Sequence, residues 1–336
     1  MLEVAAESIA FICPRCRGDL EREESAYRCV PCAATYPIVL GIPDFRVEPD
    51  PWISLEDDRA KARRLIERSE GLDLARSVDV YWSMTPGTPV EHARRFTSYV
   101  LAGEQRSAEW LDTLRPAVAL PRGPWLEIGC ASGDMLAACS SRGVQAVGVD
   151  VAMRWLVLAR KRSALAGGAP TVVCANGEFL PFRSKSFARV ISVGTLEHCR
   201  RADSVLAESA RVLRKGGDAS FRTTNRYSLL PEPHVNLWGV GFLPRRWADR
   251  YVRMRGGQGY AHHRPLSASE VGSGMRHAGF SRAKVGPARL LSSDRARLGS
   301  VGRALAPLYE RARTVPGIPA IMRWIAPLLE AHGSVA

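Results

Sequence analysis

The chain has 336 residues, 46% of them hydrophobic, and a formal net charge of +13. A chain of this length and content can bury a full α/β core and still carry one or two smaller units. No stretch is long and apolar enough to cross a bilayer, and acidic Glu3 and Glu7 stand where a signal peptide would need positive charge. These features exclude a helical membrane protein and predict a cytoplasmic location.

Four cysteines near the N-terminus have the spacing of a structural metal site. Cys13 and Cys16 form one C-x2-C pair and Cys29 and Cys32 form a second, with twelve residues between the pairs. Each pair turns two sulfurs toward one point, and four thiolates satisfy tetrahedral zinc with no open position. Two disulfides are the alternative, which a reducing cytoplasm disfavours. We therefore expect bound zinc to supply most of the folding free energy of this short segment.

The sequence around these cysteines, CPRCRGDL followed by YRCVPCAATYPIVLGIPDF, resembles the Trm112-like zinc ribbons. Members of that family, or ribbons like them, occur as partners or fused segments of methyltransferases, some of which act on RNA. The resemblance implies a zinc-ribbon domain over residues 1–48. The other four cysteines stand singly in apolar runs and are expected to be small core residues: Cys130, Cys139, Cys174 and Cys199.

Residues 49–115 are rich in charged and helix-favouring residues, and they predict a helical linker or cap. Four aromatic residues of this segment would either line a substrate entrance or pack the helices onto a sheet, and packing is favoured for any one of them: Tyr81, Trp82, Tyr99 and Trp110.

The segment from Trp125 to Asp150 predicts a strand, a tight loop, a helix and a second strand, as in nucleotide-binding α/β folds. Gly129 and Gly133 let the backbone turn sharply and leave no Cβ between the chain and a ligand. Asp150 stands where a carboxylate accepts hydrogen bonds from both hydroxyls of a ribose. The expected ligand is therefore a nucleoside.

Two cofactors fit such a unit, a nicotinamide dinucleotide and S-adenosylmethionine. The dinucleotide fingerprint needs a third glycine, which is absent here, and Asp134 would place negative charge near the pyrophosphate. S-adenosylmethionine carries no phosphate and presents an ammonium group, which acidic Glu127 and Asp134 suit. The loop therefore favours the methyl donor.

Further along the chain, ANGEFLPFRSKSFARVI over residues 175–191, GTLEH over 194–198 and RVLRKGG over 211–217 follow in order. Together with LEIGCASGD they resemble class I S-adenosylmethionine-dependent methyltransferases of the small-molecule type, over roughly residues 120–225. The resemblance implies a Rossmann-like α/β fold over residues 116–290. Such a fold has a mostly parallel seven-stranded sheet with helices on both faces.

The resemblance also assigns the cofactor site. Two of its positions depart from the family, which more often has glycine at Ala131 and aspartate at Asn176. Asparagine still accepts a hydrogen bond from the adenine amino group but lacks the charge. A Rossmann-like domain without a ligand is the alternative. The assigned residues are Glu127, Gly129, Ala131 and Gly133 for the methionine end, Asp150 for the ribose, and Asn176, Gly177 and Glu178 for the adenine. Thr195 is assigned to the cofactor as well.

Residues 226–265 form the predicted substrate insertion, over the edge of the sheet where strands end and ligands bind. Residues 226–336 hold 17 Arg and Lys against 6 Asp and Glu, whereas the first 225 residues hold 30 against 28. Arginines mixed with aromatic residues suit an aromatic or anionic small molecule, or nucleobases stacked beside phosphates. A packed lid with a solvated arginine face is the alternative.

Methyl transfer to an oxygen nucleophile requires removal of a proton, a task that suits histidine near neutral pH. The candidates are His198, after the fourth predicted strand, and His234, His262 and His263 in the insertion. For each of them, a place in the core or on the surface is the alternative.

A strand-like piece around Val285 precedes a predicted helical extension over residues 291–336, which Pro316, Pro319 and Pro327 break into short pieces. Apolar residues with interleaved arginines suit peripheral contact with an anionic membrane. Docking against the protein's own core is the favoured interpretation.

These features together predict a methyltransferase that acts on an oxygen or nitrogen of a small-molecule or lipid-linked metabolite. An RNA base methyltransferase is the alternative, favoured by the ribbon and the basic C-terminal third. Against it, residues 194–197 read GTLE where many such enzymes have N-P-P-Y or D-P-P-Y. A non-enzymatic binding module, in which ribbon and domain recruit another protein, is the third interpretation.

Overall fold

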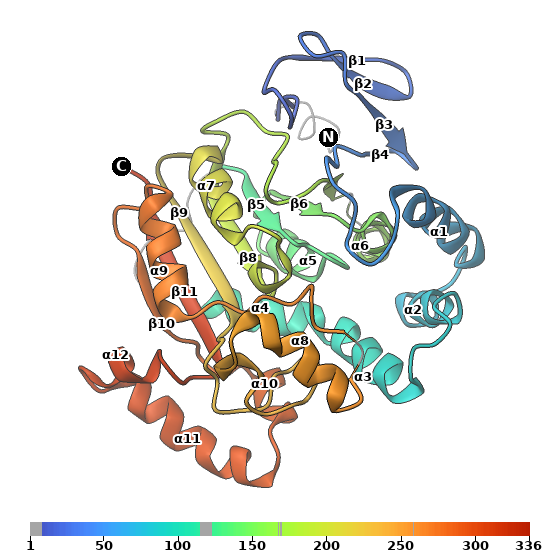
Figure 1. Ribbon diagram of the computed structural model, residues 1–336. Helices are drawn as coiled ribbons and strands as arrows, with labels where there is room; N and C mark the ends of the chain where they lie inside the picture. The colour runs from blue at the N-terminus through green and yellow to red at the C-terminus, as the bar shows by residue number, and fades with distance from the viewer. Residues whose placement is uncertain (1–8, 115–122, 167, 169, 258) are drawn as a thin grey trace. The chain divides into compact units, whose positions relative to one another are not determined.

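The computed structural model describes residues 9–114, 123–166, 168, 170–257 and 259–336. Glu3, Glu7 and the expected boundary between residues 115 and 116 lie outside these ranges. The chain divides into two units, one up to Ala188 and one from Arg189, and the division falls inside strand β8 (Phe187–Val193) (Figure 1). Among the described residues, no helix has the length and apolar character needed to span a membrane.

Four short strands near the N-terminus form an antiparallel sheet in the order β1-β2-β3-β4 (Figure 1). The Phe45 ring is fully buried and lies 5.1 Å from the ring of Phe11 and 5.3 Å from those of Tyr27 and Tyr36. An aromatic cluster of this size is a small core, and the segment needs further support. The strands are β1 (Leu20–Arg22), β2 (Ala26–Cys29), β3 (Thr35–Val39) and β4 (Ile42–Pro43).

Part of that support comes from strand β7 (Thr171–Cys174) and the loop after it. The Phe45 N–H donates to the Cys174 carbonyl at 2.7 Å, and the Ile12 N–H donates to the Pro181 carbonyl at 3.0 Å. The N-terminal sheet is thus hydrogen-bonded to a strand of the larger sheet.

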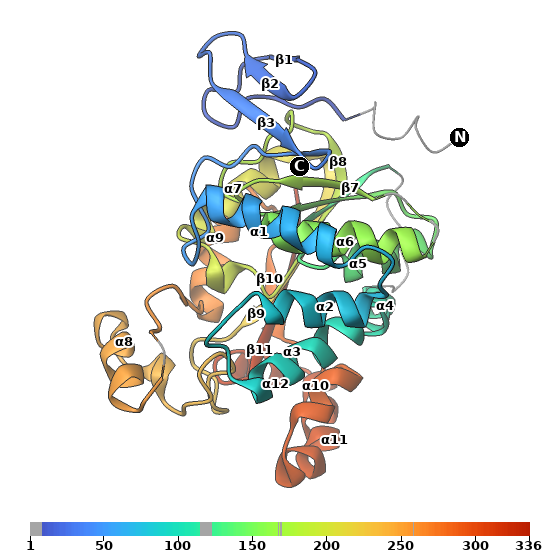
Figure 2. The same cartoon turned by 90° about the vertical axis from the view of Figure 1, so that its right-hand side faces the viewer.

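Four helices fill the segment that was expected to be helical. Ser54 begins α1 by accepting from the Asp57 N–H, and Asp73 begins α2 by accepting from the Arg76 N–H. Helix α1 packs against α6 (Met153–Leu165) (Figure 2). The helices are α1 (Leu55–Arg68), α2 (Leu74–Ser83), α3 (Val90–Leu101) and α4 (Gly103–Thr113).

The strand, loop, helix and strand predicted from residue 125 to 150 are confirmed. The strand that begins at Trp125 pairs in parallel with the strand that begins at Ala146. That second strand also pairs in parallel with β7, and its last residue, Asp150, lies opposite Cys174. Their buried apolar residues need helices on the sheet, as parallel strands generally do. The elements are β5 (Trp125–Ile128), α5 (Asp134–Ser140) and β6 (Ala146–Asp150).

In the second unit, the long strand β9 (Leu213–Thr224) follows α7 (Ala202–Val212) and pairs antiparallel with β11 (Leu328–Ser334). Strand β11 pairs in turn with β10 (Lys284–Pro287), the strand expected around Val285. The complete order is β10-β11-β9-β8-β5-β6-β7. The predicted Rossmann-like fold with a mostly parallel seven-stranded sheet is confirmed.

The C-terminal extension is not helical throughout. Helices α10 (Ser292–Arg297), α11 (Ser300–Thr314) and α12 (Ile318–Met322) are followed by β11, whose side chains alternate between buried and partly buried positions. Strand β11 is hard to predict from the sequence, because it has only seven residues and follows short helices that prolines interrupt. Its partner β9 also lies about a hundred residues earlier in the chain.

Part of this extension lies in the protein's own core, where Leu329 and Ala331 of β11 are fully buried, whereas much of α11 and α12 is exposed. Helix α11 buries Ala306 and makes polar contacts: the Tyr309 hydroxyl donates to the Ala288 carbonyl at 2.8 Å, and Glu310 accepts from the Leu290 N–H at 2.7 Å. The helix also carries large apolar residues that are exposed, as do α12 and the residues after it: Val301, Leu305, Leu308, Ile321, Trp324 and Ile325.

Candidate active site and thiol cluster

The turn after β5 has the shape that its glycines predict. Gly129 and Gly133 have φ of +81° and +72°, and a Cβ on Gly133 would lie 2.8 Å from the Cβ of Ala159 on α6. Ala131 has φ of +41°, in the region that disfavours a side chain. Ala131 therefore adopts a backbone conformation that glycine adopts more readily.

Asp150, at the end of β6, holds this turn in place. Its Oδ2 accepts from the Ala131 N–H at 2.8 Å, and its Oδ1 accepts from the Ala152 N–H at 2.8 Å. Burial raises the pKa of Asp150 to about 6, although both backbone hydrogen bonds work in the opposite direction. Each oxygen keeps a second lone pair, so the carboxylate can still accept from a ribose.

Glu127 lies on β5 and is buried, and its Oε2 has no hydrogen-bond partner among the described residues. Burial, together with the carboxylates of Asp134 and Asp150, raises its pKa well above the usual range. A buried carboxyl with an open acceptor atom fits the ammonium group of S-adenosylmethionine, which would satisfy that atom. The residues present therefore fit this cofactor.

Asp134, at the start of α5, faces α4 instead. Its Oδ2 accepts from Arg106 Nη2 at 3.1 Å and from the Ser107 hydroxyl at 2.9 Å. The Arg106 guanidinium lies 3.5 Å from the centre of the Tyr99 ring. Asp134 therefore holds helix α4 against the cofactor loop.

Asn176 is already hydrogen-bonded to the segment that leaves the N-terminal sheet. Its Oδ1 accepts from the Val47 and Glu48 N–H groups at 2.9 and 3.1 Å, and its Nδ2 donates to the Glu48 carbonyl at 3.1 Å. The role assigned to Asn176 at the adenine, with Gly177 and Glu178 beside it, stays a prediction. In the second unit Thr195 follows β8, and its hydroxyl donates to the Val193 carbonyl at 3.3 Å.

The four N-terminal cysteines converge. The donor atoms of Cys13, Cys16, Cys29 and Cys32 all lie within 4.8 Å of one another, and none of these thiols forms a disulfide. Cys13 Sγ is 3.7 Å from Cys32 Sγ, and Cys16 Sγ is 3.4 Å from Cys29 Sγ. Zinc at 2.3 Å from each sulfur would hold them about 3.8 Å apart, so the cluster fits a tetrahedral ion.

The other cysteines follow the prediction with one exception. Cys130, Cys139 and Cys174 are buried, whereas Cys199 is partly exposed. Cys199 follows the short 3-10 helix η2 (Leu196–His198), and its Sγ donates to the Thr195 carbonyl at 3.3 Å.

A buried ionic network, which the sequence did not reveal, ties the end of the N-terminal sheet to α1 and α6. Arg46 contacts Asp44 and Asp58, each at 2.6 Å, and Arg154 contacts Asp58 and Asp50, each at 2.7 Å. Arg46 Nη1 also donates to the carbonyl of Val151 at 3.0 Å, next to the proposed ribose ligand. The alternation of acidic and basic residues in PDFRVEPD is the one local signal of this network.

Three of the four candidate histidines meet in the second unit. The ring centres of His198, His234 and His263 are 4.5 to 5.2 Å apart, and His262 is not part of the cluster. Burial and the neighbouring imidazoles lower the pKa of His263 to about 3. Burial works against protonation of His234, but the carboxylate of Glu232, 2.5 Å from its Nδ1, raises the pKa of His234.

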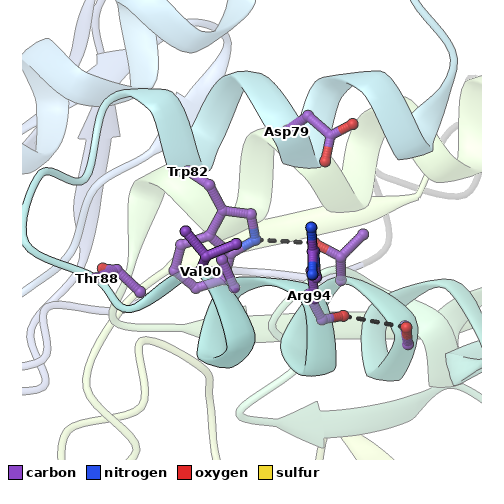
Figure 3. Close-up of a pocket in the computed structure, with 8 residues that line it drawn as sticks. Asp79, Trp82, Thr88, Val90 and Arg94 are labelled. Atoms are coloured by element: carbon purple, nitrogen blue, oxygen red, sulfur yellow. Dashed lines mark hydrogen bonds between the residues drawn. The ribbon is translucent and has the colours of Figure 1, made fainter.

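The aromatic residues of the helical segment mostly pack. Tyr81 and Trp110 are buried, and the Tyr81 ring lies 4.6 Å from that of Trp155 on α6. Trp82 borders a hollow of about 580 Å³ between α2 and α3, and its Nε1 donates to the Thr97 hydroxyl at 3.0 Å (Figure 3). None of the assigned cofactor or catalytic residues lines this hollow.

Comparison with known proteins identifies a methyltransferase domain in the chain. Residues 126–221 match the methyltransferase domain family. An uncharacterized protein of Methanocaldococcus jannaschii is 37% identical over 105 residues, which are 31% of this chain and 38% of that protein. A ubiquinone biosynthesis O-methyltransferase of Hahella chejuensis is 32% identical over 117 residues, 34% of this chain and 49% of that enzyme. The aligned parts thus cover less than two thirds of either relative.

Among solved structures, a methyltransferase of Thermotoga maritima, described as a possible histamine N-methyltransferase, has a TM-score of 0.46 and 19% identity. The alignment covers 73% of this chain and 97% of that one. The matched residues 126–221 include the turn after β5 and the carboxylate of Asp150 that holds it. The chain therefore carries a class I S-adenosylmethionine-dependent methyltransferase domain.

Proposed function

We propose that the protein transfers the methyl group of S-adenosylmethionine to an oxygen or nitrogen of a small-molecule or lipid-linked metabolite. The observation that carries the proposal is the turn held by Asp150, with the open acceptor oxygen of Glu127 beside it. In this proposal Glu127 binds the donor's ammonium group and Asp150 its ribose. Asn176, Gly177 and Glu178 border the adenine. Similarity to a ubiquinone biosynthesis O-methyltransferase supports a small-molecule acceptor.

The donor already carries the activation, so the protein has to align the two reactants, exclude water and take up a proton from an oxygen acceptor. The clustered histidines, with His262 next to them, are the proposed place where the acceptor loses its proton. The Glu232 carboxylate lies 2.5 Å from Nδ1 of His234 and so orients that imidazole within the cluster.

The test is incubation of the protein with labelled donor and fractionated cell extract. Label in small solutes or lipids supports the proposal, whereas label in RNA supports the alternative enzyme. Calorimetry with S-adenosylhomocysteine separates both enzymes from a binding module, because a failure to bind in the micromolar range contradicts any methyltransferase.

The RNA alternative rests on the basic C-terminal third and the N-terminal thiol cluster. If it holds, RNA retention falls steeply as salt is raised, because phosphate contacts release counterions. Retention that does not change with salt counts against it.

A lipid-linked acceptor is supported by exposed apolar residues of α11, α12 and the segment after α12, among them Leu308, Ile321 and Trp324. Arg303 and Arg311 of α11 are exposed as well. Apolar residues between arginines suit peripheral contact with an anionic bilayer. Co-sedimentation with phosphatidylglycerol vesicles tests this: Leu308→Glu with Ile321→Glu would abolish binding, whereas the exposed Glu67→Gln on α1 would leave it intact. Equal binding by both variants would show that the face does not contact lipid.

We also propose that the four thiols hold one structural zinc ion in a Trm112-like ribbon, in a reducing compartment such as the cytoplasm. Four sulfur ligands leave no open position, so the ion would stabilise the segment and take no part in the reaction.

A further inference from the structure

Three histidines that are distant in the sequence come together within the second unit. His198 ends η2, while His234 and His263 lie in separate loops of the insertion, before and after α8 (Arg245–Met254). One ring nitrogen from each lies within 4.8 Å of the others. His198 is exposed and the other two are half-buried, so the cluster is open to a small ligand.

The ring of His234 is oriented by the neighbouring carboxylate of Glu232. Glu232 accepts from the backbone N–H groups of His234 and Val235 at 2.9 and 3.1 Å, which fixes its carboxylate. Its other oxygen lies 2.5 Å from Nδ1 of His234. Because a carboxylate only accepts, Nδ1 carries the hydrogen and the lone pair is left on Nε2. A carboxylate that orients an imidazole in this way is the usual outer partner of a metal-bound histidine.

Backbone hydrogen bonds hold the other two histidines in their relative positions. The Arg264 N–H donates to the Glu197 carbonyl at 2.6 Å and so joins the residue after His263 to the residue before His198. The His263 N–H donates to the Tyr260 carbonyl at 3.1 Å, and the two rings are stacked 5.3 Å apart. The cluster is therefore largely formed before any ligand arrives.

We propose that His198, His234 and His263 bind one divalent transition-metal ion, of which zinc is the simplest case, with a coordination position open to an oxygen ligand. Three neutral imidazoles are typical of an open zinc site, in contrast to the closed site that four thiolates form. Metal–nitrogen distances of 2.0–2.1 Å place the nitrogens about 3.4 Å apart, which small side-chain rotations achieve from the observed arrangement.

The role of this ion rests on the proposed methyl transfer. A metal lowers the pKa of a hydroxyl that binds to it. The open position would therefore take the acceptor oxygen and release its proton to solvent, so that the histidines assist deprotonation through the ion. This favours an acceptor with a metal-binding oxygen, such as a phenol or catechol.

Metal content of the full-length protein tests the site directly. After equilibration with zinc and removal of excess metal, elemental analysis is expected to find one zinc more per chain in the wild type than in the double variant His234→Ala with His263→Ala. His277→Ala on α9 (Ala268–His277), which removes an exposed histidine, is the matched control and keeps the wild-type count. Equal zinc in the wild type and the double variant overturns the proposal.

Two further variants guard against misfolding. His198→Gln changes an exposed side chain, so its melting temperature is expected to match the wild type while the extra zinc is lost. Glu232→Gln keeps a hydrogen-bond acceptor for His234 but removes the charge, and it is expected to weaken zinc affinity about 10- to 100-fold. Retention of the second zinc at wild-type affinity by both variants overturns the proposal.

Cobalt substitution identifies the ligands. Cobalt bound by three histidines gives visible d–d bands without the near-ultraviolet sulfur charge-transfer band that cobalt in the thiol cluster produces. If the d–d bands of the histidine site are lost in His234→Ala with His263→Ala while the sulfur charge-transfer band stays, the histidine site is supported. An unchanged spectrum contradicts it. Binding of S-adenosylhomocysteine is measured on the same samples. If metal binds but no methyl transfer is found with any extract, the proposed function fails while the metal site stands.

Discussion

The carboxylate of Asp150 accepts a hydrogen bond from the backbone N–H of Ala131 at 2.8 Å, so the residue that ends β6 holds the turn that follows β5. The contact joins two parts of the cofactor site that lie nineteen residues apart. It explains how an alanine with φ of +41° is kept in a conformation more usual for glycine, because the charged acceptor offsets the backbone strain.

Asp150→Ala removes both this brace and the proposed ribose ligand. Hydrogen bonds to a charged group contribute about 1.5–3 kcal/mol, so the affinity for S-adenosylhomocysteine is expected to fall roughly 10- to 100-fold in calorimetry. The exposed Glu67→Ala on α1 is the control and is expected to bind as the wild type does. Unchanged affinity in Asp150→Ala would contradict the ribose assignment.

The raised pKa of Asp150 predicts how stability depends on pH. Burial raises it to about 6, above the value of about 3.9 in an unfolded chain, so the folded protein binds the extra proton between these values. The free energy of unfolding therefore falls as pH rises from about 4 to 6, by up to about 3 kcal/mol from this group. Urea denaturation of the cofactor-free protein is expected to show that the free energy of unfolding falls less steeply with pH in Asp150→Asn than in the wild type. The same pH dependence in both proteins would contradict the raised pKa of Asp150.

Features that depend on neighbouring residues could be predicted from the sequence. The turn at Gly129 and Gly133 requires only local backbone freedom, and the two C-x2-C pairs bring their sulfurs together within short loops. The pattern from Trp125 to Asp150 likewise predicted a strand, loop, helix and strand, whereas the rest of the Rossmann-like fold was predicted from the resemblance to methyltransferases.

Features that depend on tertiary contacts could not be predicted. Strand β11 exists because β9 offers it a hydrogen-bonding edge, and nothing near residue 328 indicates that partner. Asn176 resembles an adenine ligand in the sequence, yet in the structure its amide binds the backbone of residues 47 and 48, 128 or more residues away. The sequence named the clustered histidines separately, and the pairing of His234 with Glu232 emerged only from the structure.

The network around Arg46 predicts a large loss of stability on substitution. Arg46→Ala leaves Asp44 and Asp58 buried with less compensation, although Arg59 and Arg154 still contact them. Breaking one partner of a buried ion pair costs about 3 kcal/mol or more. Chemical denaturation is expected to show this loss.

Arg94→Ala breaks the pair between Arg94 and Glu91, whose side chains are 72% and 77% exposed, and is the control. Exposed pairs contribute little, so its effect is expected to stay within about 0.5 kcal/mol. Equal stability of the Arg46 and Arg94 variants would show that the buried network does not stabilise the fold.

Removal of zinc from the thiol cluster is expected to affect the cofactor site through residues 47 and 48, which follow the N-terminal sheet and bind Asn176. Cys16→Ser with Cys32→Ser replaces the two exposed thiols, and the proposed ribbon then loses one zinc per chain and becomes sensitive to protease between residues 13 and 45. Val47 and Glu48 follow this region and hold Asn176, so the affinity for S-adenosylhomocysteine is expected to fall as well. Cys199→Ser, outside the cluster, should change neither property. If the double variant resists protease as the wild type does, the folding of this segment does not depend on a metal held by the four thiols.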